Sequence, residues 1–329
     1  MKRLINILVI VILFSGTVSC VSEVFEQEHV AGEEILCDID FSHKNFDRVQ
    51  IDTKATLDIT QESRVLNMFV FLFTADGNRI YSRYFDKNNK KESVNEVTGS
   101  DENCWYVNTE ASGARYGTIR IKAPKVSNAI LYMIANLDED MLNISSELLN
   151  TITTIDEIES LNVDLMQETT SRNGYFPMVA RLDGVNVEST SISAGTAKLE
   201  RLDSKITVNI KLADNESLKS FFPSVCRIRN IPSGSRVVNA SSTEDYEGAG
   251  YFDGEVVFDE ETINSSGNVN GAVCSFYMLE NRETGNIKKY VNRYHDRDKR
   301  IKNSDGTYNT TGGLWLNAPE NATYLEISG

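Results

Sequence analysis

The sequence has few of the residues that build common catalytic and metal centres. Among its 329 residues it holds 3 histidines and 5 cysteines, and no two cysteines form a C-x-x-C pair. It also lacks the G-x-S-x-G, H-E-x-x-H and G-x-G-x-x-G patterns of hydrolases, zinc peptidases and dinucleotide-binding proteins. We therefore expect no enzyme, no cofactor and no metal site.

Positive charge is scarce as well. Lys and Arg together number 33 against 48 Asp and Glu, so the formal net charge is −15. Nucleic-acid binding needs clustered Lys and Arg, and this charge balance therefore excludes nucleic acid as a partner. An acidic surface suits a protein that stays in solution outside the cell.

The one long hydrophobic run stands at the N-terminus. Lys2 and Arg3 precede an apolar run from Leu4 to Phe14, and small residues then lead from Ser15 to Cys20. The run of about 11 residues is shorter than the roughly 20 that span a bilayer, so the order predicts a signal peptide over residues 1–19. Small residues directly before a cysteine resemble the lipobox of bacterial lipoproteins, which implies lipidation of Cys20. A plain signal peptide with an incidental cysteine is the alternative.

The chain after Cys20 is acidic and without periodicity, so residues 20–34 are expected to form a lipidated tether. Four further cysteines follow at wide spacing, namely Cys37, Cys104, Cys226 and Cys274. One or two disulfides and buried free thiols both remain open for them.

Strand patterns fill the rest of the chain. Ile35, Cys37, Ile39 and Phe41 alternate with mostly polar residues and predict the first strand. Further strands are expected at residues 65–73, 80–85, 118–122, 129–135, 206–212, 225–231, 237–238, 254–258, 272–279 and 323–327. Residues 86–113 are expected to form a long surface loop, and residues 145–166 a helix.

Many short strands without alternating helices indicate a mainly β protein. We predict two tandem antiparallel β-sandwich domains with one short helix, over residues 35–190 and 191–329. The chain stops at Gly329 directly after a strand pattern, which favours an incomplete second domain. A last strand left for a partner is the alternative.

Several segments in order resemble the fimbrillin and fimbrial anchor superfamily of Bacteroidales, the subunits of type V pili. The segments are Glu62–Val65, Phe69–Phe73, Asp76–Gly77, Ile134–Asn136, Arg172–Met178, Leu199–Ile210 and Phe276–Arg282. The resemblance implies transthyretin-like sandwiches, an outer-membrane lipoprotein and a place in a surface fimbrium that acts in cell adhesion. Its partners would be other fimbrial subunits and a host or bacterial surface ligand.

The resemblance also implies assembly by strand exchange. In such fibres an arginine-specific protease removes the first strand, and an extended strand of the next subunit takes its place. Ile35 to Phe41 would be the removable strand or its equivalent donor strand, and Arg48 and Arg64 the processing positions. Without a cut, the protein would remain a lipid-held anchor.

A surface glycan-binding lipoprotein is the second functional hypothesis. Exposed aromatic rings stack on sugars, and the sequence offers Trp105, Tyr106 and Trp315 for such a site.

Overall fold

The computed structural model describes the chain from residue 33 onward with gaps. It covers residues 33–43, 62, 64–109, 115–137, 142–166, 169–170, 172, 176–188, 195–211, 223–238, 250–258, 271–279 and 323–329. All described residues belong to one compact unit, residues 33–329. None of the helices within those ranges has both the length and the hydrophobicity of a membrane span.

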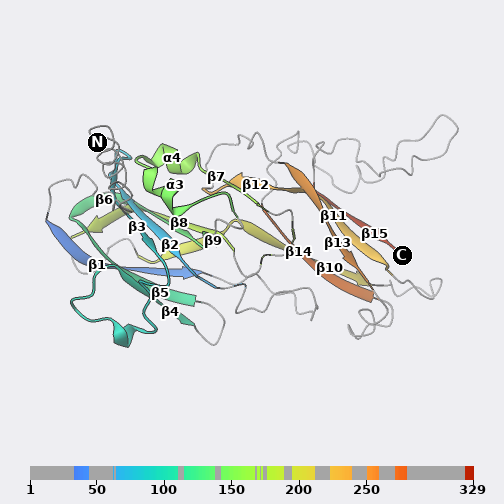
Figure 1. Ribbon diagram of the computed structural model, residues 1–329, viewed down its shortest axis with the longest axis horizontal. Helices are drawn as coiled ribbons and strands as arrows, with labels where there is room; N and C mark the ends of the chain where they lie inside the picture. Colours follow the sequence, from blue (N-terminus) through green and yellow to red (C-terminus); the bar gives the residue numbers. More distant parts are fainter. Residues whose placement is uncertain are drawn as a thin grey trace, which may run out of the picture. The chain divides into compact units, whose positions relative to one another are not determined.

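An eight-stranded sheet dominates the N-terminal half of this unit (Figure 1). Its strand order is β3-β2-β6-β8-β9-β1-β5-β4. In chain order the strands are β1 (Glu34–His43), β2 (Met68–Phe73), β3 (Arg79–Phe85), β4 (Cys104–Thr109), β5 (Arg115–Pro124), β6 (Val126–Ala135), β8 (Met178–Val187) and β9 (Ala197–Arg201). All neighbours are antiparallel except β1 and β9, which run parallel over three residues.

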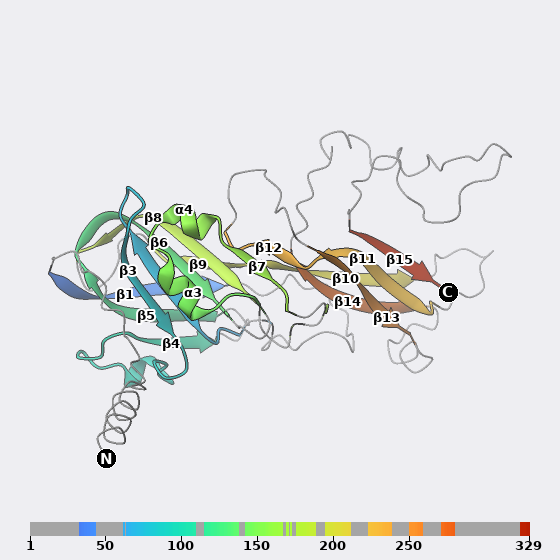
Figure 2. The same cartoon turned by 45° about the horizontal axis from the view of Figure 1, so that its top comes forward.

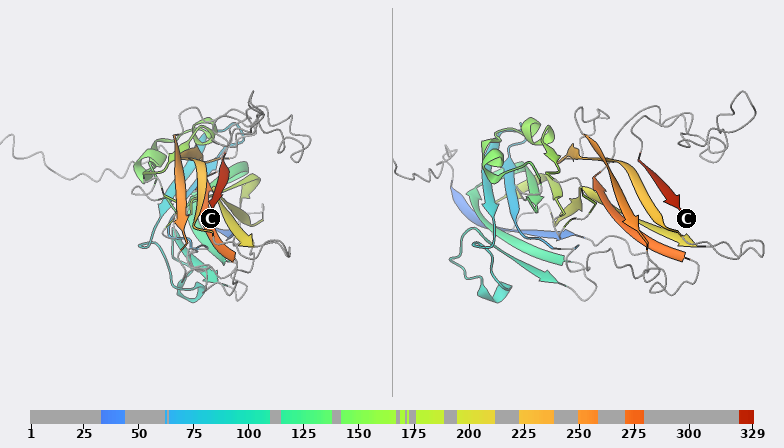
Figure 3. Two further views of the ribbon diagram at one scale, coloured as in Figure 1. Left: turned by 90° about the vertical axis from the view of Figure 1, so that its right-hand side faces the viewer. Right: turned by 45° about the vertical axis from the view of Figure 1, so that its right-hand side comes forward.

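Smaller sheets make up the C-terminal half (Figure 3). Strand β10 (Asp203–Lys211) pairs with β14 (Gly271–Leu279), and β11 (Val225–Pro232) lies between β13 (Tyr251–Val257) and β15 (Tyr324–Ser328). Strand β12 (Gly234–Arg236) pairs with β7 (Asn162–Asp164). The prediction of a mainly β protein is confirmed.

The continuous apolar run in β2 has a simple physical reason, because both faces of this strand are buried. Met68, Val70 and Leu72 lie in one core with residues of β1, β5, β6, β8 and β9. Phe69, Phe71 and Phe73 point the other way into a second core. That second core also contains Leu149 and Ile158 of the helices and residues of β10, β11 and β14.

The single predicted helix over residues 145–166 is wrong. The chain forms two short helices, α3 (Ser146–Thr151) and α4 (Ile155–Glu159), and then enters strand β7. Thr154 starts the second helix, because its hydroxyl accepts from the backbone NH of Glu157 while the Glu157 carboxylate accepts from the NH of Thr154. This capping box favours a new helix start over a continuous helix.

The predicted long surface loop is also wrong in part. Residues 86–103 form turns and a short 3-10 helix, η1 (Val94–Glu96), but Cys104–Thr109 forms β4 at the edge of the large sheet. Trp105 is fully buried there, and its indole NH donates to the backbone oxygen of Asp86 at 2.7 Å. The polar residues around β4 hid this strand from the pattern.

Strands lie on both sides of the predicted domain boundary at residue 190. Strand β9 follows it, yet β9 pairs with β8 and β1 in the same sheet. The division into two domains stays a proposal, and on this pairing its boundary belongs after Arg201.

All four described cysteines are free and buried. Burial raises the pKa of the Cys37 thiol from 9.0 to about 12, because a thiolate would lose its hydration in the core. The thiols of Cys226 and Cys274 hydrogen-bond to each other between β11 and β14. Of the two alternatives, disulfides or buried free thiols, the structure shows buried free thiols for these four cysteines.

We expect Cys37 to make the fold sensitive to alkali. The unfolded thiol ionises near pH 9 while the folded thiol stays protonated up to about pH 12, so stability falls as the pH rises between these values. Between pH 9 and 10.5 the wild type should lose about 2 kcal/mol more than Cys37→Ala, at roughly 1.4 kcal/mol per unit. Urea unfolding of both proteins at the two pH values measures this difference. Equal losses in the two proteins would contradict the assignment.

Candidate functional site

The predicted first strand occupies an internal place in the large sheet. Strand β1 lies between β5 and β9, and it pairs with β5 along its whole length from Glu34 opposite Pro124 to His43 opposite Arg115 (Figure 2). Its contact with β9 is short, from Phe41 opposite Ala197 to His43 opposite Leu199. Backbone hydrogen bonds to two neighbours therefore hold the strand, most of them from β5.

The inward face of β1 carries the alternating residues that the sequence predicts. Cys37, Ile39 and Phe41 are fully buried, and Ile35 packs half-buried against the same core. Burial of such side chains contributes roughly 1.5–3 kcal/mol each, so β1 is an integral part of this core. The prediction of a strand with these four residues on one face is confirmed, and their role as a donor strand stays a prediction.

Gly117 shapes the space that Phe41 fills. The two residues are directly opposite each other on β5 and β1. A Cβ atom added to Gly117 would overlap Cζ of Phe41 and the backbone oxygen of Tyr106. The Phe41 ring thus fills the position that a side chain at residue 117 would take, and glycine is required by this close approach.

The outward face of β1 is held by a charged pair. The Asp38 carboxylate accepts two hydrogen bonds from Arg120, at 2.7 Å from Nε and 2.9 Å from Nη2. Nη1 of Arg120 donates to the backbone oxygen of Thr98 at 2.8 Å. The hydrogen bonds to Asp38 raise the pKa of Arg120 above its usual value. Two residues along, the Thr118 hydroxyl donates to Asp40 at 2.8 Å.

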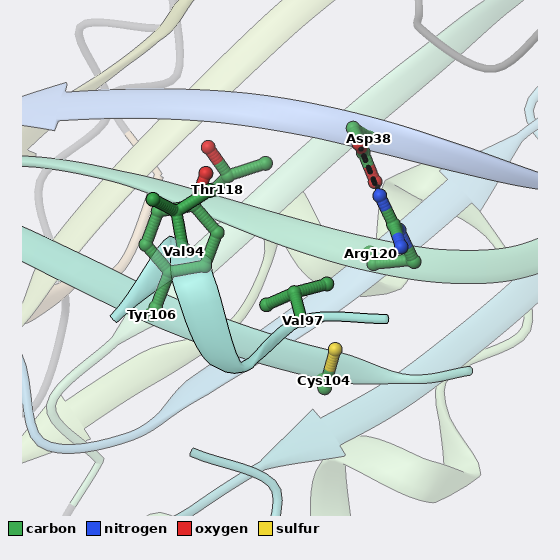
Figure 4. Close-up of a pocket in the computed structure, with 7 residues that line it drawn as sticks. All are labelled: Asp38, Val94, Val97, Cys104, Tyr106, Thr118 and Arg120. Carbon is green, nitrogen blue, oxygen red and sulfur yellow. Dashed lines mark hydrogen bonds and ion pairs between the residues drawn. The ribbon is translucent and has the colours of Figure 1, made fainter. Parts of the chain in front are cut away.

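A small cavity lies beside this pair (Figure 4). Its lining comes from β1, η1 and the residue after it, β4 and β5, and consists of Asp38, Val94, Val97, Cys104, Tyr106, Thr118 and Arg120. The cavity holds about 90 Å³, far below the roughly 300 Å³ at which small-molecule pockets begin. It has room for a few water molecules and not for a sugar ring.

A buried carboxylate fixes the chain between β1 and β2. Glu62 accepts at 2.6 Å from both Nζ of Lys205 and the hydroxyl of Tyr277, and its backbone oxygen accepts from Arg201 at 3.0 Å. Glu62 is 5% exposed, although it lies among residues that connect two strands. The end of this connection is therefore attached to β9, β10 and β14.

Arg64 follows this anchor and has an exposed side chain. Its backbone oxygen accepts from Nδ2 of Asn136 at 2.7 Å, and Oδ1 of Asn136 accepts from the NH of Leu66 at 2.8 Å. A protease needs an extended, unpaired backbone, so these hydrogen bonds protect the Arg64–Val65 bond. Arg48, the other predicted processing position, and Cys20 lie outside the described residues.

The two described aromatic residues of the glycan hypothesis, Trp105 and Tyr106, do not form an exposed platform. Trp105 is fully buried, which corrects its assignment to sugar stacking, and Tyr106 lines the small cavity. Trp315 lies outside the described residues. Within the described ranges, no group of three or more His, Cys, Asp or Glu residues is placed to hold a metal ion.

The sequence analysis did not identify Gly117 or Arg120 as residues of the site. Thr118 and Arg120 are visible in the alternating pattern of residues 118–122 as residues of the polar face, but a pattern does not reveal the cross-strand partner. Only the register of β1 against β5 brings Asp38 to Arg120 and Phe41 to Gly117.

We expect Gly117→Ala to destabilise the protein by about 1–3 kcal/mol, because the added methyl group displaces Phe41 and presses on the β4 backbone. Gly99→Ala is the matched control, since a Cβ atom at that position meets nothing within 4 Å. Thermal or urea unfolding of the two variants measures the difference. A Gly117→Ala variant as stable as Gly99→Ala would show that β1 does not pack as described.

Two of the solved structures that are similar to this chain are fimbrial proteins by their descriptions. No curated protein sequence matches the chain. One similar solved structure is a fimbrial assembly protein from Parabacteroides distasonis, at 16% identity and a TM-score of 0.44, covering 76% of this chain and 79% of the other. Another is the fimbrial anchor protein Mfa2 from Porphyromonas gingivalis, at 11% identity and a TM-score of 0.36, covering 74% of each chain.

The family match comes from the sequence itself. Residues 48–213, which are 166 of the 329 residues, match the family described as the major fimbrial subunit protein (FimA). The matched range runs from the connection after β1 to just beyond the end of β10. The chain belongs to this family of fimbrial subunit proteins.

Proposed function

We propose that the protein is a lipid-anchored fimbrial component of the outer membrane that assembles through exchange of strand β1. The observation that carries this proposal is the place of β1, an internal strand of the sheet that comes first along the described chain. No described strand or helix precedes it, so β1 can leave its place without threading another described element through the sheet.

Departure of β1 would create a groove that favours binding of another extended strand. The inner side chains of the neighbouring strands, such as Ile119, Ile121 and Leu199, would lose their apolar contacts. The β5 backbone would lose its partner over the whole length of β1. Unpaired backbone groups and exposed apolar surface both cost free energy, and an extended strand from another subunit would remove both costs.

We propose that the peptide bond whose cleavage releases β1 lies before Glu62 in the sequence. Cleavage at Arg48 would separate β1 from Glu62 and leave the anchor with the body of the protein. Cleavage at Arg64 would leave Glu62 on the released segment, still held by Lys205 and Tyr277. We therefore propose Arg48 as the releasing position and Arg64 as the less productive one.

Processing can be tested with two arginine variants. We expect an arginine-specific protease to cut the purified lipoprotein after Arg48 and to convert it into oligomers that withstand unheated SDS. Arg48→Ala should abolish both the new N-terminus and the oligomers, while Arg83→Ala, an exposed arginine on β3, should change neither. Peptide mass spectrometry and gel electrophoresis give the two readouts. Oligomers that form from uncut Arg48→Ala protein would contradict release by cleavage.

Lipidation has its own test. We expect the protein from outer membranes to start at Cys20 with two or three acyl chains, whose CH₂ groups contribute about 0.8 kcal/mol each to membrane binding. Cys20→Ser should lose the acyl mass and leave the membrane fraction, whereas Cys37→Ser should keep both. Intact mass spectrometry of each fraction decides this point. A wild-type protein with an unmodified Cys20 would refute the anchor.

A further inference from the structure

We propose that the groove occupied by β1 selects its incoming strand by two side chains on opposite faces. One is a carboxylate that faces Arg120, and the other is a large aromatic ring, three residues later, that lies over Gly117. The partner is thus an extended segment of another subunit with an acid-x-x-aromatic pattern. This inference rests on the proposed strand exchange and specifies which strands can take part.

The aromatic requirement follows from the shape of the groove. Phe41 is fully buried and directly opposite Gly117, where β5 offers no side chain to fill the space. A small side chain at this position would leave a cavity beside Gly117, and cavities in a close-packed core weaken binding strongly. A β-branched residue would cover less of the glycine than a flat ring does.

The acidic requirement follows from the charge left in the groove. Without β1, Arg120 would keep its hydrogen bond to Thr98 but lose both hydrogen bonds to Asp38. An incoming carboxylate restores this bidentate geometry, an amide restores it in part, and an ammonium group would meet a like charge. The pair is partly exposed, with 22% of Arg120 and 33% of Asp38 accessible, so its contribution is moderate.

The neighbouring contact provides an internal control. Asp40 also faces outward, but its partner is the hydroxyl of Thr118. A hydroxyl can donate to a carboxylate or an amide alike, so this position should discriminate little between Asp and Asn. The groove therefore discriminates between charged and neutral side chains at the Asp38 position and not at the Asp40 position.

The spacing of the two features also fixes the register. Residues three apart on a strand point to opposite faces, so the carboxylate reaches Arg120 only when the ring points into the core. A slip by one residue would turn the ring to solvent and the carboxylate into the core. One strand direction and one register therefore satisfy both features.

The test uses the full chain cut by an arginine-specific protease, with synthetic peptides as incoming strands. The reference peptide spans residues 33–44 with Cys37→Ser to prevent disulfides, and it carries a fluorophore for polarisation measurements. Unlabelled competitors carry D38N, D38K, D40N or F41A in addition.

We expect D38N to compete about 5-fold less well than the reference peptide, and D38K less well again, as for a partly exposed ion pair. F41A should compete more than about 100-fold less well, as for loss of a buried ring. D40N should stay within about 3-fold of the reference. The D38N effect should shrink when the salt concentration rises, because the attraction is electrostatic.

A charge swap separates recognition from general weakening. The Arg120→Glu protein should prefer the D38K peptide to the reference peptide, which reverses the wild-type order. Arg120→Met, which keeps the apolar stem of the side chain, should bind the D38N and reference peptides equally. It serves as the second variant where Arg120→Glu does not fold.

The outcomes distinguish this inference from the proposed function. Entry of every peptide with equal affinity, D38K and F41A included, would overturn the recognition pattern and leave strand exchange intact. Failure of the reference peptide to enter the cut protein would overturn strand exchange itself, and the recognition pattern with it. The reversed preference of Arg120→Glu would establish the pattern.

Discussion

The buried carboxylate of Glu62 is the constraint on which the rest of the structure depends. Its hydrogen bonds to Lys205 and Tyr277 join the connection after β1 to strands β10 and β14. Removing one partner of such a buried pair leaves an uncompensated charge, which costs about 3–5 kcal/mol. On the proposed strand exchange, this anchor marks the boundary between the part of the chain that would be exchanged and the part that would stay in place.

A second buried pair lies beside the first. Nε of Arg172 donates to Asp203 at 2.9 Å, with both side chains almost fully inaccessible. Burial raises the pKa of Asp203, although Arg172 and Arg201 act in the opposite direction. Phe176 then packs edge-to-face on Tyr277 with ring centres 4.9 Å apart. Buried ion pairs are weak sources of stability, and we interpret this cluster as a device that fixes how β9, β10 and β14 meet.

The segments that carry the family resemblance converge on this cluster. Glu62, Asn136, Arg172, Asp203 and Tyr277 come from five of these segments, far apart in the sequence. Asn136, with a left-handed backbone at a φ of 60°, binds the backbone oxygens of both Arg64 and Phe176. The resemblance therefore rests largely on polar residues that hold the fold together and not on the outward face of β1.

Sequence patterns predicted most strands because alternation and apolar runs depend only on local burial. They placed β1, β2, β5, β6, β10 and β14 close to their observed bounds. They missed β4, β7, β8, β9 and β12, where polar residues or a glycine interrupt the alternation, and they placed a strand at residues 237–238, just after β12 ends at Arg236. The helix prediction failed for a related reason, because the cap at Thr154 outweighed the spacing of the apolar residues. The partners of Asp38 and Phe41 were not predictable, since a register is a property of two strands.

The order of elements along the chain bears on whether β1 can leave the sheet. A strand in the interior of a sheet normally cannot leave without disrupting the connections on both of its sides. Here β1 is the first described element of the chain, and Glu62 in the connection after it is fixed by its hydrogen bonds to Lys205 and Tyr277. The residues just before β2 are held separately, because the NH of Leu66 donates to Oδ1 of Asn136 and Oδ1 of Asn67 accepts from the NH of Leu137. On the proposed exchange an incoming strand would also have to rejoin β5 and β4 to β9, because β1 is the strand that pairs with both β5 and β9.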